Sequence, residues 1–293
     1  MARFVPAQPR ALELQHFRDI DSIHVAMKQA INQNIGLAGA MPNIRGDADP
    51  GEWSFVNAVV VAITTQRDRI TQQLQTRFEQ VSHFNWVQWA RNVKKSTKHE
   101  LQEIRPWSEP GIDIQGQIWV RDNVALITNM SAQMEADFQR VVHDAVRQGL
   151  SRVQLKKIIM DQVDGFGGIR GMSAEQRADL IATDQILKAN SDLTAQRQKN
   201  AGVLYYRWRG VLDNRERHEH VALEGMYFRV DGKNMTAADL KAVGAEGQIF
   251  THPSQSDSQA ERPGRAVRCR CGAETVFKGS AFDFEGLEDE SED

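Results

Sequence analysis

Two cysteines, Cys269 and Cys271, stand one residue apart near the end of this 293-residue chain, and they are its only cysteines. Zinc in proteins takes four ligands from cysteine, histidine or carboxylate side chains. Two thiolates at this spacing can both face one zinc ion at a turn. His218 and His220 precede the cysteines, and His252 lies between. These residue types predict a zinc site that joins two distant parts of the chain.

The helix geometry expected around His220 limits the ligand set. On a helix that starts at Asp213, residues 213 and 220 share one face, so their side chains approach a common point. His218 is rotated away from His220 on such a helix, which disfavours a site that uses both imidazoles. A metal would also hold together a small module with a modest core by closing a long loop. The predicted ligands of one structural zinc ion are His220, Cys269 and Cys271, with Asp213 or His252 as the fourth.

The same residues also fit a site without a metal. Asp213 then caps the helix and pairs with Arg217, while His220 is a hydrogen-bonded core residue. The cysteines would pack as small apolar groups. A disulfide between such close neighbours is strained, and two cysteines are too few for the framework of a secreted domain. Reduced thiols are therefore expected, and both alternatives stay open at this point.

Catalytic signatures are missing around these residues. The triplet His218-Glu219-His220 lacks the His-Glu-x-x-His spacing of zinc hydrolases. The cysteines lack the Pro-Cys-x-x-Cys spacing of zinc deaminases. We therefore expect no enzyme activity, and a metal-dependent nucleic-acid-processing enzyme, a nuclease, is the alternative hypothesis.

The elements that must position the site begin at residue 203. Residues 203–212 are rich in aromatic and β-branched side chains and alternate Tyr206 and Trp208 with arginines. This pattern is typical of a strand. A short helix from Asp213 and a second strand at residues 226–230 are expected to follow.

The end of the chain is predicted to complete a small module. Residues 236–268 are rich in glycine and proline and are expected to be mostly loop, and residues 268–277 read as a turn and a final strand. Residues 203–278 are thus predicted to form a compact α+β module. The acidic residues 279–293 are predicted to be a disordered tail.

The chain before this module reads as helical. Apolar residues recur at helical spacing in residues 19–36 and 53–91, the second with a break near His83. Ser151 and Ser173 are predicted helix caps, and the glutamine three residues after Ser173 completes a capping box.

The fold class predicted is α+β, with an extended helical N-terminal region ahead of the small module and the acidic tail. The polar stretch 94–116 contains two prolines and is expected to be a linker or lid. The predicted domains are a helical region with mobile loops at 1–116, a second helical region at 117–202, the α+β module at 203–278 and the tail at 279–293.

Composition restricts the partners. The net charge is −3, so no overall basic field draws the chain to nucleic acid. The longest apolar run is far shorter than the roughly 20 residues of a membrane span, so we expect a soluble chain with no membrane contact. The densest basic run lies at residues 91–95. Its Arg91, Lys94 and Lys95 are candidate contacts to DNA phosphates, and a solvated helix face is the alternative interpretation.

Several separated elements together resemble the phage Mu F-like minor head proteins, also called the head morphogenesis family. In chain order these elements are Ala182-Thr183-Asp184-Gln185, Trp208, Asp213, Arg217, His220, Leu223-Glu224-Gly225 and Cys269-Arg270-Cys271. The resemblance covers about residues 117–278. The chain departs from the family at Arg268, where members usually carry asparagine.

The resemblance implies a structural minor component of a tailed-phage head. Such a protein is expected in the virion, in the head interior or at a vertex, after assembly in the host cytoplasm. Its implied partners are the portal protein and the major capsid or scaffolding protein, with non-specific contact to packaged DNA as a further candidate. Its implied roles are head assembly, DNA packaging or DNA delivery.

Overall fold

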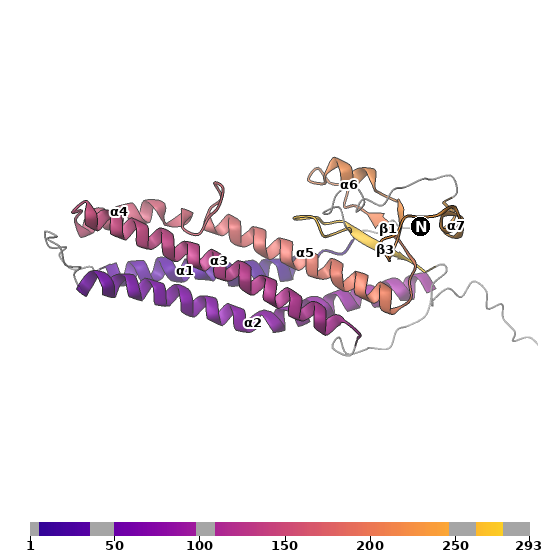
Figure 1. Cartoon of the computed structure of the whole chain (residues 1–293), viewed down its shortest axis with the longest axis horizontal. Helices are drawn as coiled ribbons and strands as arrows, with labels where there is room; N and C mark the ends of the chain where they lie inside the picture. Colours follow the sequence, from indigo (N-terminus) through magenta and orange to yellow (C-terminus); the bar gives the residue numbers. More distant parts are fainter. Residues whose placement is uncertain (1–5, 36–49, 98–108, 246–261, 278–293) are drawn as a thin grey trace, which may run out of the picture. The chain divides into compact units, whose positions relative to one another are not determined.

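The structure, a computed structural model, describes residues 6–35, 50–97, 109–245 and 262–277 (Figure 1). Its helices are α1 (Arg10–Asn34), α2 (Pro50–Thr97), α3 (Ile112–Arg147), α4 (Arg152–Gln162), α5 (Ala174–Asn200), α6 (His218–Ala222) and α7 (Ala237–Ala242), with a 3-10 turn, η3 (Val163–Gly165), after α4. Its strands are β1 (Tyr205–Arg209), β2 (Tyr227–Arg229) and β3 (Gly272–Val276). Long helices followed by a small sheet confirm the α+β fold class. The predicted acidic tail lies outside the described residues.

The chain divides into two compact units. We call Glu13–Arg77 with Val120–Thr183 the helical unit, and Met1–Leu12, Phe78–Trp119 and Asp184–Asp293 the site unit. The long helices α2, α3 and α5 each contribute residues to both units. The domain boundaries expected from the sequence follow chain order instead, and they stay predictions.

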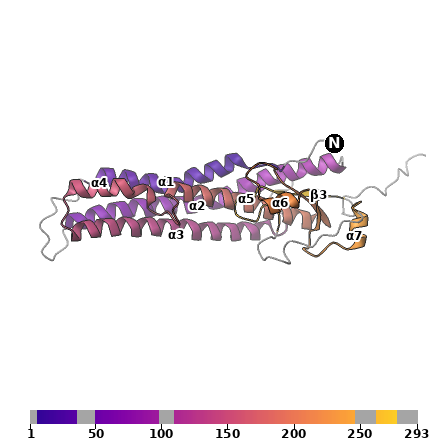
Figure 2. The same cartoon turned by 90° about the horizontal axis from the view of Figure 1, so that it is seen from above.

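The helical unit is built from helices that run side by side, as α1, α2 and α3 do in Figure 2. Ile20, Ile23 and Met27 recur at helical spacing on α1 and are fully buried. Phe55 of α2 meets Phe138 of α3 edge-on, with ring centroids 5.5 Å apart. In the part of the chain that the structure describes, no helix combines the length and apolar character needed to cross a membrane.

A buried histidine makes the helical unit sensitive to acid. His16 Nε2 of α1 lies 3.0 Å from Asn123 Oδ1 of α3, and burial lowers the pKa of His16 from 6.5 to about 4. Between these two values the unfolded chain binds a proton that the folded chain does not. Stability is therefore full above pH 6.5 and falls as the pH drops towards 4. We expect His16 to lower the free energy of unfolding by about 3 kcal/mol as the pH falls from 6.5 to 4.

The His16→Gln variant tests this expectation because a glutamine amide can replace the imidazole N–H but does not titrate. Urea unfolding at several pH values should give a smaller loss of stability for the variant than for the parent chain. Parallel pH profiles of the two proteins would contradict the assignment.

The site unit contains a three-stranded antiparallel sheet in the order β2-β1-β3. The central strand β1 pairs with β3, which comes from much later in the chain and lies beside it in Figure 1. Tyr206 and Trp208 of β1 point into the core, and Tyr206 stacks on Phe228 of β2 at 5.5 Å. Buried residues that share this core are Trp89, Val93, Val203, Val230, Cys269, Cys271 and Phe277.

The arginines of β1 occupy the other face of the sheet. Arg207 Nε and Arg209 Nε both donate to Glu274 Oε2 of β3, at 2.8 and 2.7 Å. Successive side chains of a strand point to opposite faces. The alternation of aromatic and arginine residues, which predicted this strand, therefore separates a packed face from an ion-paired face.

Local start signals predicted two helices correctly. The Ser151 hydroxyl accepts from Gln154 N–H at the start of α4, and the Gln154 side chain accepts from Ser151 N–H at 2.8 Å. Ser173 and Gln176 make the same pair of bonds at the start of α5, at 3.2 and 2.9 Å. Capping boxes involve residues only three positions apart, so the sequence alone determines them.

Three expectations about the elements were wrong. Helix α1 starts at Arg10 rather than near residue 19, because Asp19 is no cap; its carboxylate pairs with Arg77. Helix α2 runs without a break past His83, since no glycine or proline interrupts residues 52–97. The region expected to be mostly loop contains α7, which starts at a capping box that the sequence analysis missed, Thr236 with Asp239. Residues 98–108, the centre of the expected linker or lid, lie outside the described ranges.

Candidate metal centre

The candidate site lies within the site unit, where three segments meet. Strand β1 supplies Trp208, α6 supplies His220, and the segment before β3 supplies Cys269 and Cys271. A hydrogen bond of 2.8 Å from Cys269 N–H to Ala266 C=O closes a turn in that last segment. The turn directs the two cysteines towards α6.

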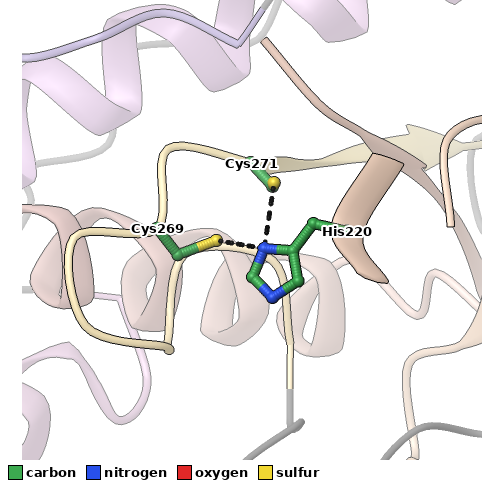
Figure 3. A group of neighbouring side chains, drawn as sticks. All are labelled: His220, Cys269 and Cys271. Carbon is green, nitrogen blue, oxygen red and sulfur yellow. Dashed lines mark hydrogen bonds between the residues drawn. The ribbon is translucent and has the colours of Figure 1, made fainter. Parts of the chain in front are cut away.

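Three donor atoms converge at this point (Figure 3). His220 Nδ1 lies 3.4 Å from Cys269 Sγ and 3.6 Å from Cys271 Sγ, and all three atoms lie within 4.8 Å of one another. Both cysteines are buried, and His220 is half-buried. One imidazole nitrogen and two sulfurs suit a borderline-soft cation such as zinc. The structure thus brings together the three main predicted ligands, and metal binding by them stays a prediction.

The surroundings of the sulfurs favour a thiolate. The Gly264 N–H donates to Cys269 Sγ at 3.3 Å. A hydrogen bond from Cys271, with further bonds from His220 and the Gly264 N–H, lowers the pKa of Cys269 against the opposing effect of burial. The same bond, burial and the nearby Glu216 carboxylate raise the pKa of Cys271. The pKa values of the two neighbouring thiols are therefore shifted in opposite directions.

Asp213 does not lie on a helix with His220, which corrects its predicted place. Asp213 Oδ1 accepts from Arg215 N–H at 3.0 Å, and this bond folds the chain into a turn instead of a helix. Helix α6 begins only at His218. Both Asp213 oxygens accept from the Arg270 guanidinium at 2.5 and 2.6 Å, and this bond chiefly lowers the pKa of Asp213. The carboxylate is therefore occupied as an ion-pair partner.

Glu216 is a carboxylate that contacts a cysteine, and it was not among the ligands predicted from the sequence. The Cys271 thiol donates to Glu216 Oε1 at 3.2 Å, while Glu216 Oε2 accepts from Leu212 N–H at 2.5 Å. A glutamate four residues before His220 was the available signal, because residues four apart share a face of the expected helix. The other predicted fourth ligand, His252, lies outside the described residues.

The remaining motif residues hold the backbone around the site. The Trp208 ring meets the His220 ring edge-on at 5.4 Å. Arg217 donates to Val267 C=O at 2.8 Å and is not the partner of Asp213. Gly225, with φ of 80°, donates its N–H to Trp208 C=O at 2.9 Å, and a positive φ is cheapest for glycine. These residues act as structural supports.

Arg268 occupies a backbone position that fits the asparagine usual in the family pattern, and nothing in the structure explains the arginine. Its φ is 55°, in the left-handed region where asparagine is enriched among non-glycine residues. Its N–H donates to the Asp184 carboxylate of α5 at 3.1 Å. Asp184, part of the upstream family-like element, thereby anchors the segment that carries the cysteines.

The basic run lies on the exposed end of α2. Arg91, Lys94 and Lys95 are exposed, and the two lysines stand in the last turn, where they also complement the helix dipole. Lys95 borders a cavity of about 360 Å³ that adjoins the cysteine segment. The amide and hydroxyl residues lining this cavity include Gln8, Asn85, Gln88, Asn92, Asn190 and Thr194.

Comparison with known proteins connects this module to a family. An uncharacterized protein of Haemophilus influenzae is 26% identical over 208 residues, which are 71% of this chain and 39% of that protein. No solved structure matches the chain significantly. Residues 136–274 match the family described as Phage Mu protein F like protein, and this range holds Trp208, His220 and both cysteines. Residues 136–274, slightly less than half of this chain, are therefore similar to the Phage Mu protein F-like family.

Proposed function

We propose that this chain is a structural minor head protein of a tailed phage, which docks on the portal or the inner capsid face. Its proposed roles are head assembly, DNA packaging or DNA delivery. The family match over residues 136–274 carries this proposal. The geometry agrees with a structural role, because the motif residues around the cysteines bind backbone groups and one another.

Purified particles assembled from the genome that encodes this chain provide the test. Quantitative mass spectrometry of the particles should find the chain at a small fraction of the copy number of the major capsid protein. Cross-linking of intact particles should join it to the portal or the capsid shell. Absence of the chain from particles, together with an unchanged yield of filled heads after its deletion, would refute the proposal.

We further propose that Arg91, Lys94 and Lys95 contact packaged DNA through phosphates. All three are exposed near the end of α2, and such contacts read charge rather than sequence. The Arg91→Glu/Lys95→Glu variant should lose most of its binding to random duplex DNA at low salt, with a shallower salt dependence. The matched control is Lys156→Glu/Lys157→Glu, which changes two exposed lysines of α4. Equal losses in both variants would show that only net charge matters.

A further inference from the structure

We propose that His220 Nδ1, Cys269 Sγ and Cys271 Sγ bind one zinc ion, with the fourth coordination position facing Glu216. The ion would be structural and would fasten the segment before β3 to α6. The proposal concerns the module itself and does not depend on the function in a phage head.

The spacing of the donor atoms fits tetrahedral zinc. Bond lengths of about 2.3 Å to sulfur and about 2.0 Å to nitrogen place tetrahedral sulfur and nitrogen ligands about 3.5 Å apart. The two observed sulfur-to-nitrogen distances are 3.4 and 3.6 Å. Binding therefore needs little movement of the three side chains. His220 offers the same nitrogen, Nδ1, to both sulfurs (Figure 3).

The groups around the ligands would hold them in place. The Gly264 N–H donates to Cys269 Sγ, and the Trp208 ring packs against the His220 imidazole. Arg270, between the two cysteines, is held by Asp213 through two hydrogen bonds. Partners of this kind orient metal ligands and tune their basicity. These supporting contacts are already formed in the structure, in which His220 contacts both sulfurs by hydrogen bonds.

A metal would supply stability that the local chain lacks. Helix α6 is five residues long and has no buried residue. A helix this short is unstable without tertiary contacts. His220 is 49 residues from Cys269, so the ion would close a long loop at this helix. Zinc would thus hold α6 against the sheet.

The fourth position lies beside a small cavity. The cavity has a volume of about 120 Å³, and its lining includes Arg215, Glu216, Arg217 and His220. Glu216 Oε1 is already 3.2 Å from Cys271 Sγ, so a rotation of its side chain would bring a carboxylate oxygen to the ion. A fourth protein ligand would make the site closed, as structural zinc sites are.

Metal analysis of the full chain tests the proposal. Protein purified without chelator and then incubated with Zn²⁺ should hold one zinc per chain after desalting, with Kd of about 0.1 μM or tighter. With Co²⁺ in place of zinc, the parent chain should show the visible absorption of tetrahedral cobalt and a thiolate charge-transfer band. These two measurements need no variant and are not affected by misfolding of one. A folded parent chain without bound zinc and without a thiolate–cobalt band would overturn the proposal.

Variants then assign the ligands. His220→Ala and Cys269→Ser should each weaken zinc binding by about 100-fold or more. Removing a group that only supports a metal ligand already costs about 10- to 100-fold in affinity, and removing a ligand itself should cost at least as much. The matched control is His218→Ala, an exposed histidine of the same helix, which should bind zinc like the parent chain. Equal zinc binding by all three variants would place the metal elsewhere and overturn the assignment.

Glu216→Gln tests the fourth position separately. Its zinc affinity should fall by about tenfold while the thiolate–cobalt band remains, because the two cysteines still bind. An unchanged affinity would overturn the role of Glu216 in zinc binding.

Discussion

Replacing Arg197 with alanine is expected to lower the free energy of unfolding by about 3–5 kcal/mol, the usual cost of breaking a buried ion pair from one side. Arg197 of α5 is almost fully buried, and its guanidinium donates to both Glu109 oxygens at 2.8 to 3.2 Å. It also donates to Ser82 C=O, Ser82 Oγ and Asn85 Oδ1. The alanine variant would leave the buried Glu109 carboxylate without its cation.

Urea unfolding followed by circular dichroism measures this loss. Arg147→Ala is the matched control, because Arg147 is an exposed arginine whose partner Asp144 is also exposed. Such a substitution usually changes stability by less than about 0.5 kcal/mol. The stability of Arg197→Lys should lie between those of Arg197→Ala and Arg147→Ala. A lysine ammonium keeps the charge but cannot donate to all the acceptors that the guanidinium contacts. If Arg197→Ala is no less stable than Arg147→Ala, the buried network has no net stabilising role.

Replacing Trp208 with alanine is expected to lower the free energy of unfolding by about 3–5 kcal/mol, the range found for large aromatic residues in protein cores. Trp208 is 2% exposed and meets Phe228 and His220 edge-on, with ring centroids 6.0 and 5.4 Å away. Its removal would leave a cavity next to His220. Zinc binding should weaken in the same variant, because the imidazole would lose the ring that orients it.

Trp208→Phe separates packing from hydrogen bonding. Trp208 Nε1 is buried with no hydrogen-bond partner among the described residues. The Trp208→Phe substitution therefore removes no hydrogen bond. It should lower the free energy of unfolding by only about 1–2 kcal/mol, because an aromatic ring still fills most of the space. Thermal unfolding and zinc titration of both variants check this. A phenylalanine variant as unstable as the alanine variant would show that the indole N–H has a partner.

Short-range features of this chain could be predicted from the sequence. The capping boxes at Ser151 and Ser173 depend on residues three positions apart. The strand at β1 follows from its alternation of Tyr206 and Trp208 with arginines, since side chains alternate between the faces of a strand. The residue types of a thiol and imidazole site were also visible in Cys269, Cys271 and His220. Each of these signals is read over a few neighbouring residues or from chemistry alone.

Other features depended on partners far along the chain. Asp213 looked like a helix cap, but it lies in a turn, and Arg270, 57 residues later, donates to its carboxylate. Glu216 contacts Cys271 only because the chain turns at Asp213 instead of entering a helix. A carboxylate with several cations nearby in sequence gives no local sign of which one it will meet. The carboxylate that contacts Cys271 was therefore beyond sequence reasoning.

The sequence by itself determined the fold class, the family-like motif and the three residues that converge at the site. Only the tertiary structure decided which carboxylate stands beside them and which polar side chains are buried. Arg197 shows why: it lies in a polar stretch of α5 that reads as solvated, yet its partners Glu109 and Ser82 are 88 and 115 residues away. Helical and strand periods report which face a residue occupies, whereas burial of a charge depends on a partner that only the folded chain brings to it.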